Sequence, residues 1–523
     1  MNKNFLTTAF ILLMTCTYGS SAFAKSTKSL YWRIQNTSWN DQFELSYQQF
    51  IHTLGIARKN NLCHTTDQCL RSPVANPRYA ALNPRRLNFI YSDCADLPYV
   101  LRAYFSWMND LPFSFESELM AATSLSFLAT DIRYSRFGNI ITGKDQVFDG
   151  ESINQVLQKI NDTVSSAMFR TNASTSDSGY FFRDTYPTAI NRDAIAPGTV
   201  LYDPNGHVAV VYDVTSNGKI YLIDAHPDNS LSAITYGEKF ARSRLQIGGG
   251  FSNFRPYYQS ENSIIAKRNY ELPNYSLIQY QTEPFIFKGQ VVSFYEYVRA
   301  VLAEGIIIYN PLGEFTDQLS ELCQDILYRE EAVNTSLASM IQESPHPDFL
   351  PANIYGADGD WEAYATPARD ARLKASVRGI KDYLEKIIRG YKNHSVQIIY
   401  HGVDLVKDLR EIYLTKSESC SVNARANFKI NMDFILKNIF ALSFDPYHCA
   451  ELRWGILGNN SCSSTANKMA WYTAEQGLRN RIDRDNNIKT DYDVNTLPNA
   501  PVSQVPKPDL SFDKILEITR TYN

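Results

Sequence analysis

The chain has 523 residues, of which 44% are hydrophobic and 20% charged, values that are ordinary for a globular protein of two or three domains. A formal net charge of -4 lacks the basic excess of proteins that bind a nucleic-acid backbone, so we expect no nucleic-acid partner. Beyond the first residues, no stretch has enough uninterrupted apolar residues for a transmembrane helix, so we expect no stable membrane span.

Residues 1–24 have the pattern of a cleaved secretory signal. Lys3 gives a positive start, residues 5–14 are mostly apolar, and Ala22-Phe23-Ala24 is a small-x-small cleavage site. The apolar run is too short to cross a bilayer. We therefore expect a periplasmic or secreted protein.

The first half of the mature chain mixes helix and strand patterns. Residues 25–74 are predicted to be an N-terminal helical segment, because apolar residues of 41–58 recur on one helical face. Residues 97–108 form a second predicted helix, whereas 110–196 give no clear pattern. Three predicted strands follow, with turn residues between them: 199–202, 207–214 and 219–224.

The second half is predicted to be helical. Residues 261–285 change in composition and are interpreted as a linker. Ser293-Phe294-Tyr295-Glu296 is a capping box, and Thr366-Pro367 places proline at the first position of an amphipathic helix. We expect a helical domain of unknown role and unknown protein partner over 286–490, then an extended Pro-rich tail over 491–523.

The cysteines indicate one free thiol. Of eight cysteines, Cys16 lies in the predicted signal, so an odd seven remain in a compartment where disulfides form. We favour three pairs among many connectivities, which leave Cys94 free: Cys63–Cys69, Cys449–Cys462 and Cys323–Cys420. Metal binding at Cys63-His64 or His448-Cys449 is an alternative, but neither pair has zinc-site spacing. We expect no metal and no cofactor.

Cys94 and His207 are the candidates for chemistry. Cys94 lies just before a predicted helix, whose N-terminus lowers the pKa of a thiol. His207 begins the middle predicted strand. Asp224 and His226 lie on one face at the end of the third, so either can orient the imidazole of His207. The four residues predict a thiol hydrolase in which Cys94 attacks a carbonyl and His207 is the general base.

These segments resemble the NlpC/CHAP branch of papain-like cysteine hydrolases. Asp93-Cys94-Ala95-Asp96-Leu97 is similar to the family's helix start, Asp-Cys-Ser-Gly-Leu. Pro197-Gly198-Thr199-Val200 and His207-Val208-Ala209-Val210-Val211-Tyr212 are similar to its next two strands. Ile223-Asp224-Ala225 is similar to the last strand, which ranks Asp224 above His226 as the orienting residue. The resemblance covers residues 75–260.

The resemblance implies an α+β fold class, with a papain-like (NlpC/CHAP-type) domain over 75–260 that contains a short antiparallel sheet and a mostly α-helical domain behind it. Members of the family mostly cleave peptide or amide bonds in bacterial peptidoglycan without a metal, so the implied substrate is a stem peptide. Two alternatives stay open. One is an acyltransferase or transglutaminase-like enzyme with the same triad, and the other is a catalytically inactive envelope binding module.

Three features depart from the family pattern. Asp96 stands where the family has glycine. Pro98 cannot donate a backbone hydrogen bond, so we expect the helix to begin late or to bend. The long interval between Cys94 and His207 indicates an insertion that forms a lid, a specificity wall or a block. Ser92 or Asp96 is the expected cap of the helix.

Overall fold

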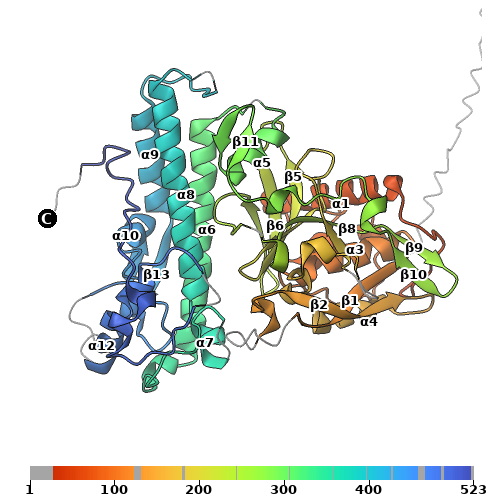
Figure 1. Cartoon of the computed structure of the whole chain (residues 1–523), viewed down its shortest axis with the longest axis horizontal. Coiled ribbons are helices and arrows are strands. Elements are labelled where there is room, and N and C mark those ends of the chain that lie inside the picture. The colour runs from red at the N-terminus through yellow and green to blue at the C-terminus, as the bar shows by residue number, and fades with distance from the viewer. Residues whose placement is uncertain are drawn as a thin grey trace, which may run out of the picture.

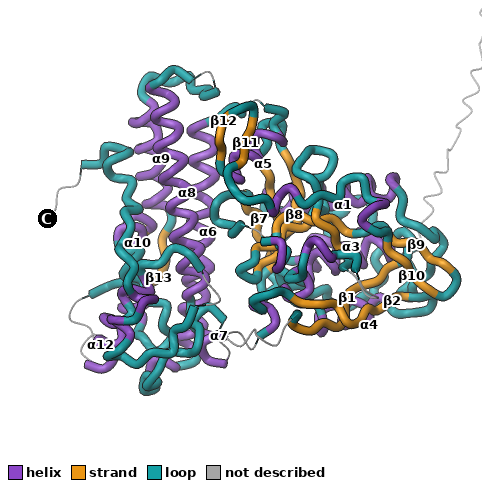
Figure 2. Tube along the Cα trace, viewed as in Figure 1, coloured by secondary structure: helices purple, strands orange, loops and turns teal. Residues whose placement is uncertain are grey.

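The structure, a computed structural model, consists of two parts that lie side by side (Figures 1 and 2). The first part holds most of the strands, and the second is built on long helices. This mixture of helices and antiparallel sheets agrees with the α+β expectation. The predicted signal lies outside the described residues, which are 27–122, 131–178, 183–242, 244–305, 307–356, 359–395, 397–425, 428–457, 466–484 and 488–519.

A six-stranded antiparallel sheet organises the first part, with the strand order β3-β8-β4-β5-β6-β7. The three strands predicted from the sequence are its neighbours β4, β5 and β6, and β5 has the predicted bounds. The strands of the sheet are β3 (Thr185–Pro187), β4 (Val200–Asp203), β5 (His207–Val214), β6 (Ile220–Ala225), β7 (Leu231–Thr235) and β8 (Gly250–Phe254).

Strand β5 is buried on both faces because its side chains alternate between two cores. Val208 and Val210 pack in the core that contains the N-terminal helices, whereas Ala209 and Val211 pack in a second core on the other face. Gly55 lets the first helix approach the strand closely, since a β-carbon there would lie 2.1 Å from Tyr212. The two cores hold β5 in a fixed place, and therefore also His207 at its start.

Among the described residues, four helices that precede the sheet and three hairpins also belong to the first part. The first of these hairpins comes from the region that the sequence could not assign, residues 110–196, where an 11-residue helix also lies. The helices are α1 (Asp41–Lys59), α2 (Thr66–Arg71), α3 (Asp96–Met108) and α4 (Ile153–Thr163). The hairpin strands are β1 (Phe113–Ala121), β2 (Asn139–Val147), β9 (Tyr257–Ser260), β10 (Ser263–Ala266), β11 (Phe285–Phe287) and β12 (Gln290–Val292).

Residues 261–285, predicted as a linker, pack against the first part. The fully buried Gln279 accepts the backbone N–H of Phe251 in β8 and donates to its carbonyl, both at 2.8 Å. The next helix, α5 (Phe294–Leu302), is capped by the predicted Ser293 box and joins the core behind β5. The packed first part therefore continues past the boundary expected at 286.

Three long helices, α6 (Pro311–Ala338), α8 (Pro367–Lys392) and α9 (Leu405–Ser419), form the second part (Figure 1). Pro367 stands at the first position of α8, as predicted. None of the described helices has the length and apolarity that a bilayer crossing requires. The shorter elements are α7 (Gly359–Tyr364), β13 (Ser421–Arg425), β14 (Phe428–Asn431), α10 (Met432–Lys437), α11 (Ala450–Arg453), α12 (Ala466–Ala474) and α13 (Gln476–Arg479).

The predicted Pro-rich tail, 491–523, packs on the helices as far as it is described. Leu497 is fully buried in one core of the second part, and Phe512 and Leu516 are buried in another. Burying these apolar side chains offsets the entropy that the tail loses when it is ordered.

Two of the three predicted disulfides are confirmed. Cys63 pairs with Cys69, and Cys323 of α6 pairs with Cys420 at the end of α9. Cys449 is also disulfide-bonded, but its predicted partner, Cys462, lies outside the described residues. Cys94 is free, as predicted.

Candidate functional site

Asp93 positions Cys94 at the start of α3. Its Oδ1 accepts the backbone N–H groups of Ala95 and Asp96 at 2.8 and 3.0 Å, and the Asp96 carboxylate accepts the N–H of Asp93 at 3.3 Å. This reciprocal pair is a capping arrangement. The expectation that Ser92 or Asp96 caps the helix is wrong, because the side chain of Ser92 bonds Thr66 at 2.6 Å and Asp96 is the partner inside the helix.

Pro98 does not delay the helix. Helix α3 begins at Asp96, only two residues after Cys94, and Pro98 lies in its first turn. Backbone N–H groups of a first turn have no carbonyl partner within the helix, so a proline there costs little. Every residue of α3 is buried, which fixes the direction of the helix below the sheet.

The sheet brings His207 and Asp224 together. His207 opens β5 and Asp224 lies near the end of the neighbouring β6, where its Oδ2 is 2.6 Å from Nε2 of His207. Ser232 of β7 donates to the other carboxylate oxygen. Although burial raises the pKa of Asp224, the imidazoles of His226 and His207 hold it well below its ordinary value. Asp224 is therefore ionised, and its hydrogen bond fixes the ring of His207.

His226 does not reach His207. Its Nε2 lies 2.9 Å from Oγ of Ser232 and 3.8 Å from Oδ1 of Asp224. The ring also packs against Tyr328 of α6, with 4.2 Å between the ring centroids. Of the two residues that the sequence offers for orienting His207, Asp224 makes the contact and His226 joins the two parts of the molecule.

Cys94 lies beside the start of β5. Its sulfur is half-buried and receives a hydrogen bond from the backbone N–H of Val208, the residue after His207. Because Nε2 of His207 is taken by Asp224, Nδ1 is the ring nitrogen left to serve the thiol. Within the described residues, the sulfur and this ring make no direct hydrogen bond, which is common for such pairs before substrate binds.

The electrostatics of the pair differ from the expectation. Burial and the charge of Asp93 raise the pKa of Cys94 to about 12, so the expected lowering of the thiol pKa is wrong for this arrangement. Burial and the positive charge of Arg372 lower the pKa of His207. The backbone hydrogen bond from Val208 and the charge of Arg372 lower the pKa of Cys94, but by less than burial raises it. Cys94 and His207 therefore rest as a neutral thiol and a neutral imidazole.

Arg372 of α8 brings a positive charge from the second part to this site. The charge acts on both Cys94 and His207. Arg372 is half-buried, and in the described parts of the chain its guanidinium has no ion pair or hydrogen bond. It lines a cavity of about 340 Å³ together with Asp203, whose backbone pairs with His207. The charge of Arg372 also acts on the buried Asp325. Because its guanidinium makes no hydrogen bond to the described residues, it is available to the carboxylate of a bound molecule.

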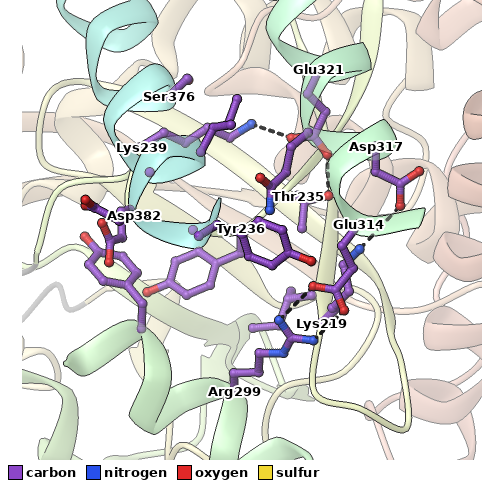
Figure 3. A pocket seen from close by; sticks show the side chains of 18 of the residues that line it. Lys219, Thr235, Tyr236, Lys239, Arg299, Glu314, Asp317, Glu321, Ser376 and Asp382 are labelled. Atoms are coloured by element: carbon purple, nitrogen blue, oxygen red, sulfur yellow. Dashed lines mark hydrogen bonds and ion pairs between the residues drawn. The ribbon is translucent and has the colours of Figure 1, made fainter. Parts of the chain in front are cut away.

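A second cavity, of about 410 Å³, lies further along the interface between the two parts (Figure 3). Its wall carries ion pairs such as Lys239 with Glu321 at 2.8 Å and Arg299 with Glu314 at 2.9 Å. The two cavities share four lining residues, so they lie next to each other between the two parts, and the smaller one is nearer the start of β5. The shared residues are Glu238, Lys239, Tyr295 and Ala375.

The chain matches no family model, no curated protein and no solved structure. Sequence reasoning missed two residues of the site. Asp93 was detectable, because it stands three residues before the N–H of Asp96 that it accepts. Arg372 was not, because it lies in a different part of the fold, and only tertiary packing brings it to Cys94.

Proposed function

We propose that the protein is an exported cysteine hydrolase, of the papain-like NlpC/CHAP type, that cleaves peptide or amide bonds in peptidoglycan stem peptides. The observation that carries the proposal is the hydrogen bond between His207 and Asp224 beside the unpaired thiol of Cys94. A nucleophile next to a base, with the base held by a third group, is the arrangement that acyl transfer needs. The substrate class follows from the resemblance and from the predicted signal.

Because Cys94 and His207 both rest uncharged, the thiol must lose its proton as the reaction begins. Nδ1 of His207 takes the thiol proton as sulfur attacks the carbonyl carbon, and Asp224 stabilises the imidazolium that forms. The imidazolium then protonates the leaving amine, and an acyl-enzyme remains on Cys94. Water attacks this thioester with His207 as base, which releases the acid and restores the thiol. The backbone N–H of Cys94 is the candidate donor to the oxyanion.

The products test the reaction class. Purified protein incubated with defined muropeptides is expected to yield two fragments whose summed mass exceeds the substrate by one water. A product that carries an added amine instead would assign the acyltransferase alternative. Absence of any product, with a thiol that resists alkylation at neutral pH, would favour the inactive binding module, which the raised pKa of the Cys94 thiol also favours.

Arg372→Gln is expected to raise KM for a stem peptide roughly 10- to 100-fold and to change kcat little. A charged hydrogen bond to a carboxylate is worth about 1.5–3 kcal/mol, which corresponds to that factor. Steady-state kinetics of the acid and amidated forms of one peptide check the assignment, because the variant should lose only the preference for the acid. Arg389→Gln is the matched control, since it lies on the same helix about 25 Å further along. Equal KM changes in both variants would contradict a specific role for Arg372.

A further inference from the structure

The second part contains a buried cluster of potential metal ligands far from Cys94. His346 follows α6 in a loop, Asp445 lies in the loop after α10, and Glu475 stands between α12 and α13. One ligand atom from each lies within 4.8 Å of the other two, and all three residues are buried. The sequence separates them widely, so only the fold reveals the cluster.

The hydrogen bonds of His346 leave one ring nitrogen facing an anion. Its Nδ1 lies 2.6 Å from the carbonyl oxygen of Pro347, which can only accept, so Nδ1 carries the proton. In a neutral ring, Nε2 then offers a lone pair to Oδ2 of Asp445 at 2.8 Å. Two acceptors in contact require a cation or an extra proton between them. A histidine that donates its other N–H to a backbone carbonyl is typical of metal ligands.

Two further side chains in the cluster have unsatisfied atoms. No hydrogen bond of good geometry reaches Nε2 of His448 or either carboxylate oxygen of Glu475, although the carboxyl group of Asp445 lies close to Glu475. The nearest cation, Arg479, is 3.7 Å from Glu475, beyond hydrogen-bond distance. Nε2 of His448 lies 3.5 Å from the same Asp445 oxygen that His346 contacts. Leaving such groups unpaired in a protein interior is costly, and one divalent ion would satisfy them together.

We propose that His346, Asp445 and Glu475, completed by His448, bind a structural Zn²⁺ ion. Two imidazole nitrogens and two carboxylate oxygens form a donor set that zinc accepts in tetrahedral geometry. Zinc bonds of about 2.1 Å place tetrahedral donors about 3.4 Å apart. Donor atoms of His346, Asp445 and Glu475 lie within 4.8 Å of one another, so metal binding would draw them closer together, and His448 would move in from its place beside Asp445. The cluster is closed to solvent, which is the arrangement of a structural site. Cys449 is excluded as a ligand because it is disulfide-bonded.

The ion would join the loops around α12 and α13 to the end of α6. His346 stacks on Trp471 of α12 with 4.1 Å between the ring centroids, so its position is fixed before metal binds. Because a ligand that binds only the folded state stabilises it, metal removal should loosen this end of the second part.

Metal content and metal titration test the proposal on the full-length chain. Elemental analysis of the purified protein is expected to give one zinc per chain. After removal by a chelator, Zn²⁺ should rebind with a stoichiometry of one and raise the melting temperature, and Co²⁺ should give the absorption bands of a tetrahedral site. Glu475→Gln, which preserves shape, should weaken Zn²⁺ binding at least roughly 100-fold.

Asp370→Asn is the matched control, since Asp370 is a buried carboxylate of the same part, paired with Arg329 at 2.7 Å and outside the cluster. It should keep stoichiometric zinc binding whatever it does to stability. If metal-free wild-type protein takes up no stoichiometric Zn²⁺, or if Glu475→Gln binds it as the wild type does, the proposal is overturned. The titration of wild-type protein with Zn²⁺ tests the proposed site even if Glu475→Gln fails to fold.

Discussion

Cys94→Ala is expected to lower kcat for stem-peptide hydrolysis by on the order of a million-fold, the loss that follows removal of a nucleophile from a triad. Without the sulfur no acyl-enzyme forms, and only binding and oxyanion stabilisation remain. The measurement is the rate of fragment release from a defined muropeptide, followed by mass spectrometry. Because Cys94 is free, the substitution breaks no disulfide.

Thermal unfolding provides the control for this variant. Cys94 is half-buried, and replacing its thiol by a methyl group removes little packing, so the melting temperature should change by only a few degrees. A folded Cys94→Ala protein that releases fragments at the wild-type rate would eliminate the thiol mechanism. The cavities between the two parts would then need another nucleophile or another function.

Asp224→Asn is expected to lower kcat by roughly ten-thousand-fold while the shape of the site stays intact. An amide can donate to Nε2 of His207 and so place the proton on Nδ1, the nitrogen that must accept the thiol proton. Loss of the carboxylate also removes the interactions with Asp224 that raise the pKa of His207. The imidazole would stay neutral to lower pH, so the acidic limb of the kcat/KM profile should move further down.

His226→Gln is the control that distinguishes the orienting role of Asp224 from a general disturbance of the site. His226 bonds Ser232 and packs on Tyr328 without reaching His207, so the variant should keep kcat within about tenfold and leave the acidic limb within about half a pH unit. The opposite ranking, with His226→Gln inactive and Asp224→Asn active, would reverse the assignment of the orienting residue. The pH profile matters because a merely structural role for Asp224 would lower the rate without moving the limb.

Features set by neighbouring residues were predictable from the sequence. The apolar run from Val208 to Tyr212, bounded by turn residues, predicts β5. The Ser293 box and Pro367 predict two helix starts, because each signal is contained within one turn or one strand. Strand periodicity offered both Asp224 and His226 as partners of His207, because both lie on one face at the end of the neighbouring strand, and Asp224 makes the contact.

Features set by long-range packing were not predictable. Gln279 turns residues of a predicted linker into part of the first domain by bonding Phe251, and nothing in the local composition indicates this contact. The pKa of Cys94 follows burial by distant segments, so its helix-start position suggested the wrong direction. Arg372 reaches the site only because the two parts of the molecule dock.

The cavities between the two parts limit what the proposed enzyme could attack. Volumes of about 340 and 410 Å³ accommodate a short peptide segment and exclude an intact globular protein. Such a hydrolase could work in a crowded cell envelope and trim thin polymers there while its folded neighbours went undigested. The shape of the site, in addition to the chemistry of Cys94, would then keep the enzyme from cleaving the folded proteins of its own cell.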